Sequence, residues 1–359
     1  MAKRGLNIYH RRDGRWEGRY KDGFRADGKP KYRSIYAKTY GEVKEILLKL
    51  KSAEQKTKSF CTLTVKQLFE EWLNMKKLCV KESTIANYVF KINKHLLTFF
   101  GGLKFSSLSP KLIYDFIQKK KSEGLSVKYI SDMIVILKSL AKYTAKTYHC
   151  ANKITDIELQ KVPKNELKLY SKEEQEILKS ELFKEINPAK LGILLCLFSG
   201  IRIGELCALK WSDIDLSHGL LYVTKTCQRI KCGNSTKLVI TTPKSTSSAR
   251  VIPLPEFLLN TLKEFASSNL NEYFLSGTEK ITEPRTMQYR FKSILKKVNL
   301  PSTNFHSLRH IFATNCIALG FDVKTLSEIL GHGTVEITLN RYVHSSMSRK
   351  RECMELLNI

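Results

Sequence analysis

The sequence predicts a multidomain α+β protein, and three observations lead to that fold class. The chain has 359 residues, enough for two or three domains of ordinary size. Short runs that alternate as strands do lie between residues 8 and 36, whereas apolar residues at helical spacing dominate the remainder. Two polar stretches without periodicity, 51–59 and 151–167, lie between the patterned regions. We therefore expect three domains, which span 1–58, 61–158 and 166–359.

The first domain, 1–58, is expected to be a small three-stranded β-sheet with one helix behind it. Asp-Gly pairs between alternating runs are a strong hairpin signal, and the strand-like runs are Ile8–His10, Arg15–Tyr20 and Lys31–Tyr36. From Tyr40 to Leu50 the apolar residues recur at helical spacing. Residues 1–60 carry 17 Lys plus Arg and 7 Asp plus Glu, a net charge of +10. Basic and aromatic residues interleave on strands that fit the major groove, so we expect contact with DNA rather than only a solvated basic surface.

The second domain, 61–158, is expected to be a compact bundle of four helices. Each helix is expected to begin at a good capping residue: Thr64, Ser83, Ser109 or Ser126. Gln67 completes a capping box with Thr64, and Pro110 occupies the first helical position after Ser109. Apolar residues follow each start at helical spacing, and Gly101-Gly102 ends the second helix.

The third domain, 166–359, is expected to be mostly helical with a small antiparallel sheet. A capping box of Ser171 and Glu174 opens it. The pattern predicts one strand at 219–225 and a hairpin whose strands span 237–242 and 249–254. Helices are expected to dominate from Glu256 to the end.

The charge balance favours a polyanionic partner. Lys and Arg number 61 and Asp and Glu 34, which gives a net charge of +27. Nucleic acid is the first candidate for such an excess, an anionic membrane surface is the second, and a lysine-rich proteome is the trivial explanation. No run of about 18 apolar residues is present, so we expect no membrane-spanning helix and no membrane partner. The N-terminus lacks the apolar region of a secretory signal, so a cytoplasmic protein is expected.

The cysteines indicate neither disulfides nor a metal site. The chain has nine, an odd number without a framework spacing, and we expect reduced thiols. A zinc site needs about four ligands, usually in two tight pairs. Cys227 and Cys232, with His218 upstream, supply only one loose pair. We therefore expect no bound metal ion.

Residues suited to phosphodiester cleavage gather in four segments of the third domain: Ser199–Leu206, His306–His310, Leu330–Gly333 and Asn340–His344. Transesterification needs a nucleophile in line with the leaving oxygen and cations on the non-bridging oxygens. Arg202 and Arg309 can supply the cations, because the guanidinium fork matches phosphate. Tyr342 can be the nucleophile if a base, usually a histidine, takes its proton. The leaving oxygen needs a proton donor, and Lys244, between the strands of the predicted hairpin, suits that step.

Singly, each of these residues has an ordinary structural explanation. Arg202 can pair with Glu205, three residues on, and Tyr342 can be a packed aromatic residue. His306 can cap a helix, and His332 can be a residue of a loop. The functional interpretation depends on their occurring together and in one order along the chain.

In that order the segments resemble the tyrosine recombinase family, the integrases of temperate phages and conjugative transposons. The family's pattern is an arginine, a lysine, His-x-x-Arg, a second histidine or tryptophan, and the tyrosine. The matching positions here are Arg202, Lys244, His306, Arg309, His332 and Tyr342. The similarity extends over residues 170–350, and one departure is Gly333, where many relatives have serine. For the lysine, Lys225 and Lys237 remain alternatives, because both lie on or near the predicted hairpin.

The resemblance implies a site-specific recombinase that integrates and excises a mobile element. In that family the tyrosine forms a 3′-phosphotyrosine link and frees a 5′-hydroxyl, and strands are rejoined through a Holliday junction without a nucleotide, metal or other cofactor. It also implies a homotetramer on double-stranded DNA, with the first domain on arm sites and the helical bundle on core sites. Excisionase and a DNA-bending host factor are the expected accessory partners, and the bacterial nucleoid is the expected location. The tail after Tyr342 would dock on a neighbouring protomer or cap its own domain, and both remain open.

Two other classes of protein share features with this sequence. A type IB topoisomerase uses the same chemistry without exchanging partners, but it has little need of a separate basic domain at the N-terminus. A non-enzymatic DNA-binding regulator would have lost part of the active site, whereas all six positions are filled here. The sequence therefore favours the integrase.

Overall fold

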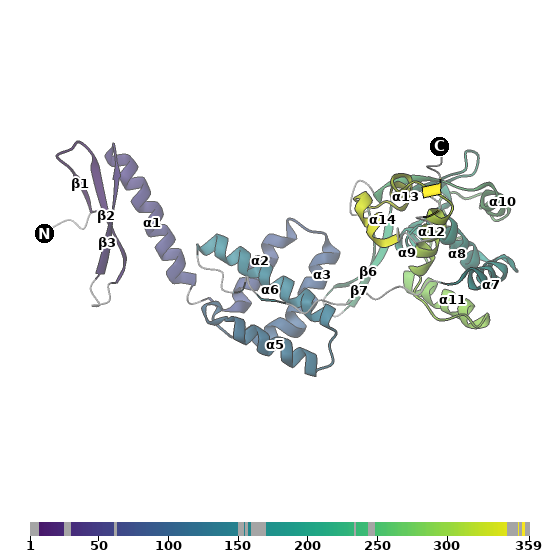
Figure 1. Ribbon diagram of the computed structural model, residues 1–359, viewed down its shortest axis with the longest axis horizontal. Helices are drawn as coiled ribbons and strands as arrows, with labels where there is room; N and C mark the ends of the chain where they lie inside the picture. The colour runs from purple at the N-terminus through teal and green to yellow at the C-terminus, as the bar shows by residue number, and fades with distance from the viewer. Residues whose placement is uncertain are drawn as a thin grey trace. The chain divides into compact units, whose positions relative to one another are not determined.

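The computed structural model contains two compact units, Met1–Lys164 and Asn165–Ile359, which are described separately (Figure 1). The structure describes residues 7–24, 30–60, 63–149, 154, 157–158, 170–232, 235–242, 248–342, 351 and 354–355. The fold is of the predicted multidomain α+β class, with small antiparallel sheets among mostly helical elements. Within the described ranges, no helix is both long and apolar enough to cross a membrane.

A three-stranded antiparallel sheet begins the first unit, as predicted. Its strands are β1 (Ile8–His10), β2 (Trp16–Phe24) and β3 (Pro30–Ala37), in the order β1-β2-β3. Helix α1 (Tyr40–Phe60) lies against the sheet (Figure 1). A Cβ added to Gly18 would come within 2.5 Å of Val43 and 2.9 Å of Leu47, both on α1. Glycine at this position therefore lets the helix pack closely on β2.

The prediction of a linker at 51–59 is wrong, because α1 continues through these residues to Phe60. Lys, Glu, Gln and Ala make up most of this stretch, and all four are strong helix formers. They provide no apolar stripe, so periodicity alone could not detect the helix. The division of the first unit at residue 58 stays a prediction.

The helices that follow form the predicted bundle. They are α2 (Val65–Lys77), α3 (Glu82–Lys91), a π-helical turn (Ile92–Leu96), α4 (Leu97–Phe100), a 3₁₀ turn (Phe105–Ser107), α5 (Pro110–Ser122) and α6 (Val127–Tyr148). The segment from α3 through α4 is continuous and is the second of the four predicted helices. Thr64, Ser109 and Ser126 are the N-caps that we predicted. Ser83 is not, because α3 already begins at Glu82.

The second unit is mostly helical and surrounds a large hydrophobic core, with a smaller hydrophobic cluster beside α12 and α13. Its helices are α7 (Lys172–Phe183), α8 (Pro188–Ser199), α9 (Ile203–Ala208), α10 (Glu256–Glu264), α11 (Pro284–Lys297), α12 (Ser307–Ala318), α13 (Val323–Leu330) and α14 (Val335–Tyr342). Residues 191–197 of α8 are all buried, and α8 contacts α7, α10, α11 and α12. Because α8 is held on all sides, it fixes the position of the loop at 200–202 that follows it.

Strand pairing in the second unit differs from the predicted hairpin. The strands are β4 (Ile214–Asp215), β5 (Leu220–Val223), β6 (Thr226–Cys232), β7 (Ser235–Thr241) and β8 (Arg250–Pro253). β7 pairs with β6, and β8 pairs with β5. The prediction that 237–242 and 249–254 pair with each other is wrong, because it overlooked β6. The β5–β8 register sets Arg250 opposite Val223, close to the candidate site.

Candidate active site

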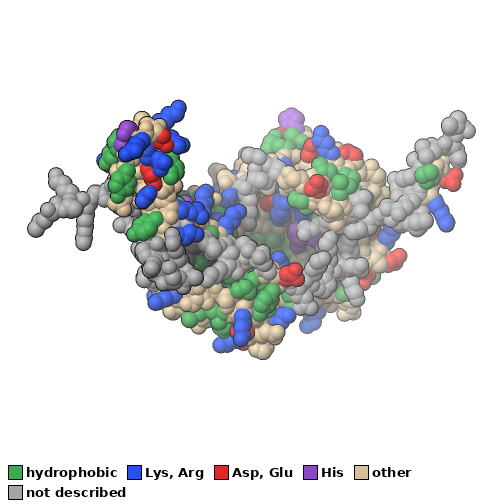
Figure 2. All heavy atoms as spheres, turned by 60° about the vertical axis from the view of Figure 1, so that its left-hand side comes forward, with side chains coloured by type: hydrophobic (Ala, Val, Ile, Leu, Met, Phe, Trp, Pro, Cys, Tyr) green, Lys and Arg blue, Asp and Glu red, His purple; other side chains and the backbone are tan. Residues whose placement is uncertain are grey.

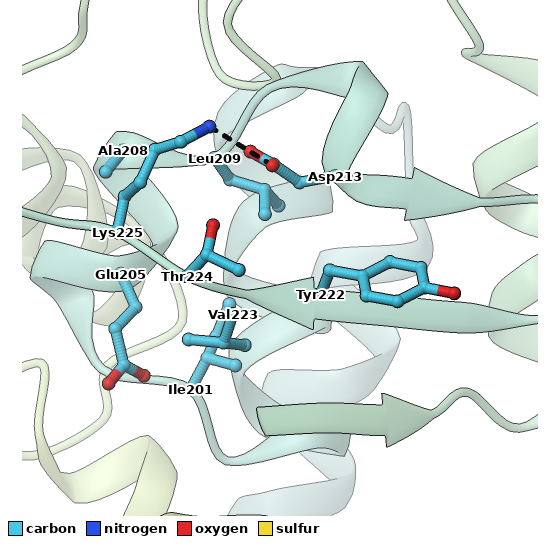
Figure 3. Close-up of a pocket in the computed structure, with 9 residues that line it drawn as sticks. All are labelled: Ile201, Glu205, Ala208, Leu209, Asp213, Tyr222, Val223, Thr224 and Lys225. Carbon is cyan, nitrogen blue, oxygen red and sulfur yellow. Dashed lines mark hydrogen bonds and ion pairs between the residues drawn. The ribbon is translucent and has the colours of Figure 1, made fainter. Parts of the chain in front are cut away.

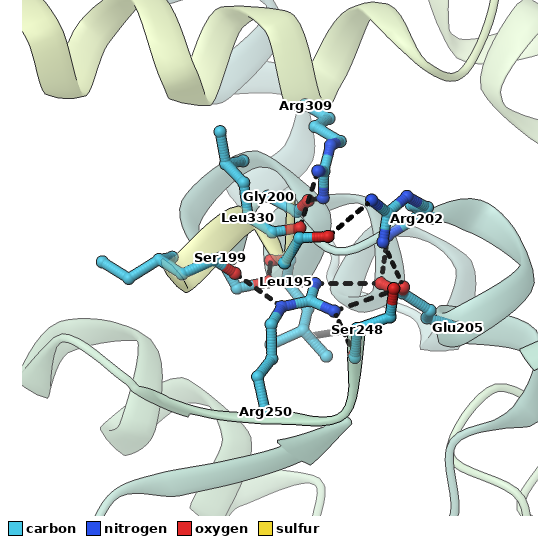
Figure 4. A network of polar contacts seen from close by, with 11 residues as sticks. Leu195, Ser199, Gly200, Arg202, Glu205, Ser248, Arg250, Arg309 and Leu330 are labelled. Carbon is cyan, nitrogen blue, oxygen red and sulfur yellow. Dashed lines mark hydrogen bonds and ion pairs between the residues drawn. The ribbon is translucent and has the colours of Figure 1, made fainter. Parts of the chain in front are cut away.

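Three arginines of the second unit converge on the last turn of α13 (Figure 4). Each donates to one of three consecutive carbonyl groups: Arg250 to Ile329, Arg309 to Leu330 at 2.6 Å, and Arg202 to Gly331 at 3.2 Å. The last carbonyls of a helix lack partners within it and carry its partial negative charge, so they attract cations. The end of α13 thus fixes three guanidinium groups immediately before His332.

A buried glutamate holds two of these arginines. Glu205, 4% exposed, accepts from Nη1 of Arg202 at 2.7 Å and from the two terminal nitrogens of Arg250 at 3.0 and 3.2 Å. It also accepts from the backbone N–H of Arg202 at 2.9 Å, at the start of α9. Burial raises the pKa of Glu205, but the contacts with Arg250 and Arg202 outweigh burial and leave the pKa below its ordinary value. Glu205 is therefore a carboxylate at neutral pH.

Arg309 is the most deeply buried of the three arginines, at 2% exposure. Its Nη1 donates to the carbonyl of Gly200 at 2.7 Å. Burial, followed by the positive charges of Arg202 and Arg250, lowers the pKa of Arg309 to about 9. Three cations beside one carboxylate leave an excess of positive charge, and guanidinium groups bind phosphate particularly well. The cluster therefore favours a phosphate-like anion.

The turn after α8 carries Arg202 into this cluster. Gly200 follows α8 with a φ of +67°, a left-handed conformation that costs glycine little. A Cβ at this position would lie 2.5 Å from the ring of Phe312 and 2.9 Å from Leu330. Both the backbone conformation and the packing thus require glycine, and Arg202 follows two residues later as the N-cap of α9.

Four aromatic rings form a continuous series in the same site. The rings of His306, just before α12, and His310, on its first turn, have centroids 4.8 Å apart. The ring of Tyr342 lies 5.4 Å from that of His310 and, nearly parallel, 6.3 Å from that of His332. Nδ1 of His332 is hydrogen-bonded to the hydroxyl of Thr338 at 2.7 Å. Because Thr338 and Tyr342 both belong to α14, this helix orients the histidine and the tyrosine together.

The hydroxyl group of Tyr342 is buried. Tyr342 is 7% exposed and packs in a small cluster with residues of α12 and α13, among them Leu330. Its oxygen has no hydrogen-bond partner among the described residues. A buried hydroxyl without a partner is costly, so such a group calls for an explanation. A bound substrate that supplies the partner is one.

Five of the six predicted site residues are linked by these contacts: Arg202, His306, Arg309, His332 and Tyr342. Lys244 lies outside the described residues. Of its alternatives, Lys237 is on β7, and Nζ of Lys225 pairs with Oδ1 of Asp213 at 3.3 Å. Figure 3 shows that pair beside a pocket of about 10 Å³, room for a single water molecule. The choice of lysine stays a prediction.

The sequence analysis missed two residues of the site, Arg250 and His310. A signal for His310 was present, because it is four residues after His306 and so lies on the same helical face. No such signal existed for Arg250. Its partner Glu205 is 45 residues away, and the pairing of β5 with β8 brings the strand to the site.

The expectation that Cys227, Cys232 and His218 hold no metal ion stays a prediction, because the side chain of Cys232 lies outside the described part of the structure. Among the residues that the structure describes, no three His, Cys, Asp or Glu side chains are placed to hold a metal ion. His218 is hydrogen-bonded through Nδ1 to Asp215 at 2.8 Å. Burial raises the pKa of the Cys227 thiol to about 11, which disfavours the thiolate that metals bind.

A cluster of arginines with a buried, unpartnered tyrosine hydroxyl close to Arg309 is an arrangement suited to the transfer of a phosphodiester to a tyrosine. Tyrosine recombinases and type IB topoisomerases share this chemistry. Residues 168–349, more than half of the chain, match the phage integrase family, and residues 64–121 match the phage integrase, N-terminal SAM-like domain. The chain belongs to the phage integrase family.

Curated relatives give the same assignment. A tyrosine recombinase XerC-like protein of Caldanaerobacter subterraneus is 27% identical over 331 residues, 83% of this chain and 84% of that protein. The ICEBs1 integrase of Bacillus subtilis is 24% identical over 340 residues, 90% of both chains. The chain is thus an integrase that cleaves and rejoins DNA, and of the three classes considered above the first is confirmed.

Solved structures confirm the fold. The integrase of transposon Tn1549 in complex with circular intermediate DNA superposes with a TM-score of 0.70 at 22% identity, and the match covers 83% of this chain and 100% of that one. A lambda integrase tetramer bound to a Holliday junction gives a TM-score of 0.59 at 17% identity and covers 96% of this chain and 99% of that one.

Proposed function

We propose that Tyr342 is the nucleophile of this recombinase and that Arg202 and Arg309 bind the scissile phosphate. The tyrosine oxygen attacks phosphorus, and the bond from phosphorus to the 5′ oxygen breaks. The phosphate remains on the 3′ oxygen, now joined to the tyrosine. The phenolic proton passes to a base, and the departing 5′ oxygen takes a proton from an acid. A 5′-hydroxyl from the partner strand reverses the step.

The unpartnered hydroxyl of Tyr342 is the observation that carries this proposal. It is buried close enough to Arg309 for the two groups to interact electrostatically. The excess positive charge of the arginine cluster and the missing partner of the hydroxyl are both satisfied by one phosphodiester. A tyrosine that served only for packing would not need its oxygen buried without a partner.

The histidines and the lysine complete the proposed reaction. His332, oriented by Thr338, and His306 are assigned to the phosphate and to movement of the tyrosine proton. Lys244 is assigned as the acid that protonates the 5′ oxygen. Because the bond energy is kept in the phosphotyrosine, the reaction requires no cofactor.

We also propose that the open face of the N-terminal sheet binds arm sites in DNA. Glu17 is paired with Tyr9 on β1 and with Tyr36 on β3. Neighbouring residues of a strand point to opposite faces of the sheet. Because Gly18 faces α1, Glu17 and its two paired tyrosines face away from that helix. Lys and Arg side chains lie among hydrophobic ones on this part of the surface, at the upper left of Figure 2. Deletion of 1–58 is expected to spare cleavage at an isolated core site and to impair complete recombination.

Glu17 organises that face. It accepts hydrogen bonds from Arg11 at 2.9 Å, Arg19 at 2.9 Å and Ser34 at 2.7 Å. Arg11 also lies over the ring of Tyr36, 5.2 Å from its centroid. Side chains that are already ordered lose less conformational entropy when they bind. This order supports the assignment of the sheet to DNA recognition.

The remaining assignments concern assembly. We propose that the bundle at 61–158 binds core sites and that 166–359 is the catalytic domain. We also propose that four protomers act together on two duplexes, by analogy with the lambda integrase tetramer bound to a Holliday junction. Excisionase and a DNA-bending host factor are proposed as accessory partners at the bacterial nucleoid. The net charge of +27 supports the DNA contacts.

Covalent trapping on nicked DNA tests the nucleophile. A pool of nicked duplexes with randomised sequence is incubated with the wild-type chain, and one duplex selected from the adducts then serves for all variants. Wild type is expected to form the adduct and Tyr342→Phe to form none, with DNA affinity unchanged. Tyr289→Phe, at an exposed tyrosine of α11, is the control and should react as wild type does. An adduct from Tyr342→Phe would refute the proposal.

A further inference from the structure

We propose that Arg250 is a positioning residue for strand cleavage, which neutralises Glu205 so that Arg202 can direct its charge to the scissile phosphate. The inference rests on the proposed function, because it takes Arg202 and Arg309 as the phosphate ligands. Neither the sequence pattern nor the six predicted site residues include Arg250.

Four of the five N–H groups of the Arg250 guanidinium donate to oxygens of the protein (Figure 4). Nη1 donates to Glu205 at 3.2 Å and to the carbonyl of Ser248 at 3.0 Å, Nη2 donates to Glu205 at 3.0 Å, and Nε donates to the carbonyl of Ile329. The side chain is 6% exposed. Arg250 would have to break these hydrogen bonds with protein oxygens in order to bind the phosphate directly. Arg250 therefore acts through its neighbours.

Arg202 shares the same carboxylate but is placed differently. Its Nη1 contacts Glu205 at 2.7 Å, while its side chain remains 34% exposed. A buried carboxylate needs a compensating cation. If Arg250 were absent, Arg202 would be the sole cation hydrogen-bonded to Glu205 among the described residues. The attraction to Glu205 would then compete with the attraction to the phosphate.

The charge of the site supports this role. Three arginines and one glutamate give +3 − 1 = +2. Attack of a tyrosinate, with a charge of −1, on a phosphodiester, also −1, gives a transition state of −2. Charge accumulates on the non-bridging oxygens, where fixed cations are most effective. Without Arg250 the net charge of these four groups falls from +2 to +1, and they stabilise the doubly negative transition state less.

Arg250 also connects the arginines to the second histidine. Its Nε holds the carbonyl of Ile329, and the carbonyls of Leu330 and Gly331 hold Arg309 and Arg202. His332 follows in the chain. A strand of the sheet thus fixes the turn that presents both phosphate ligands and the histidine.

Single-turnover cleavage of the selected nicked duplex tests the proposal. Arg250→Met is expected to slow cleavage about 10- to 100-fold, less than the 10²–10³ loss typical when a direct donor is removed. Arg250→Lys keeps the charge and should stay within about 10-fold of wild type. Glu205→Gln combined with Arg250→Met restores the site to +2, because Arg202 and Arg309 remain. This double variant should cleave at least about fivefold faster than Arg250→Met alone.

A matched control is available in the same unit. Glu181, 5% exposed, is held by Lys190 at 3.0 Å and by Lys297 at 2.8 Å, just as Glu205 is held by two arginines. Lys297→Met removes one cation from a buried glutamate and changes the net charge equally. It should leave the cleavage rate unchanged. Thermal unfolding of each variant shows whether a loss of rate exceeds a loss of folded protein.

A duplex with a methylphosphonate at the scissile position gives a readout that a purely structural role would not change. This phosphate analogue carries no negative charge, so it needs one cation less. The ratio of wild-type to Arg250→Met rates should therefore be smaller on the methylphosphonate than on ordinary DNA.

Several results would overturn the inference. The first is a ratio of wild-type to Arg250→Met rates that is equal on the methylphosphonate and on ordinary DNA. The second is a double variant, or an Arg250→Lys variant, that cleaves no faster than Arg250→Met. The third is an Arg250→Met variant that cleaves as fast as wild type. Tyr342→Phe, included in parallel, separates this failure from failure of the proposed function. If Tyr342→Phe forms an adduct, the nucleophile assignment is wrong; if it does not, the result concerns Arg250 alone.

Discussion

Replacement of Gly200 by alanine should strain the turn that carries Arg202 into the active site. A residue with a Cβ at φ +67° costs about 1–2 kcal/mol. Forcing that Cβ against the ring of Phe312 and against Leu330 adds about 1–3 kcal/mol. The free energy of unfolding of the second unit should therefore fall by about 2–5 kcal/mol, a large share of the 5–15 kcal/mol typical of a domain.

Gly277→Ala separates the two contributions. Gly277 has a φ of +59°, but nothing lies within 4 Å of an added Cβ, so only the cost of about 1–2 kcal/mol applies. Urea unfolding can be followed through the fluorescence of Trp211, in a background where Trp16 and Trp72, the other two tryptophans, are phenylalanine. The difference between the two variants measures the crowding against Phe312.

A functional difference should accompany the difference in stability. The carbonyl of Gly200 accepts from Nη1 of Arg309, so a displaced turn moves a proposed phosphate ligand. Gly200→Ala should reduce covalent trapping even where the protein is fully folded, whereas Gly277→Ala should not. Equal losses of stability and equal trapping by the two variants would refute the argument that packing at this turn positions the site.

Three further predictions concern other groups. Hydrogen bonds from Ser34, Arg19 and Arg11 lower the pKa of Glu17 from 4.5 to about 2. Its stabilisation of the sheet should therefore be complete above pH 4.5 and disappear toward pH 2. Hydrogen exchange in residues 7–24 of wild type and Glu17→Gln measures this, and a difference that does not vary with pH would contradict it. His310→Ala should slow single-turnover cleavage about 10- to 100-fold by releasing the rings of His306 and Tyr342, with DNA affinity unchanged. His310→Phe should recover most of that rate if the ring rather than its nitrogen matters, and an equal loss in both variants would show the reverse. Lys244→Ala should slow cleavage of ordinary DNA but not of a duplex with sulfur as the 5′ leaving atom, because a thiolate departs without a proton. Equal slowing on both duplexes would exclude Lys244 as the acid and direct the same comparison to Lys225 and Lys237.

Local chemistry made much of the fold predictable. The capping boxes at Thr64 and Ser171 mark helix starts because a side chain replaces a missing backbone partner, and both are present in the structure. The hairpin of β6 and β7 was also within reach. Gly233-Asn234, between the two strands, is a typical two-residue hairpin sequence, and the sequence analysis overlooked it.

Other features could not be predicted from local patterns. The pairing of β5 with β8 joins segments about thirty residues apart, and no spacing in either strand specifies its partner. Arg250 enters the site through that pairing. The extension of α1 over 51–60 depends on helix propensity in a segment without an apolar face.

The six site residues were predicted from their order along the chain. The structure adds the contacts that position the described ones. Arg202 has the ion pair with Glu205 that its ordinary structural explanation required, and it belongs to the arginine cluster as well. The two interpretations are therefore not alternatives. Glu205 serves the site by fixing Arg202, and Arg250 compensates the charge of Glu205.

Identification of the residue joined to DNA tests the central claim most directly. The adduct of the wild-type chain with the selected duplex is digested with nuclease and trypsin, and its nucleotide-linked peptide is fragmented in a mass spectrometer. The peptide Tyr342–Arg349 follows Arg341 in the sequence and contains one of the 15 tyrosines of the chain. The nucleotide is expected on Tyr342, joined through its 3′ phosphate. A nucleotide on any other residue, or one joined through a 5′ phosphate, would contradict the account.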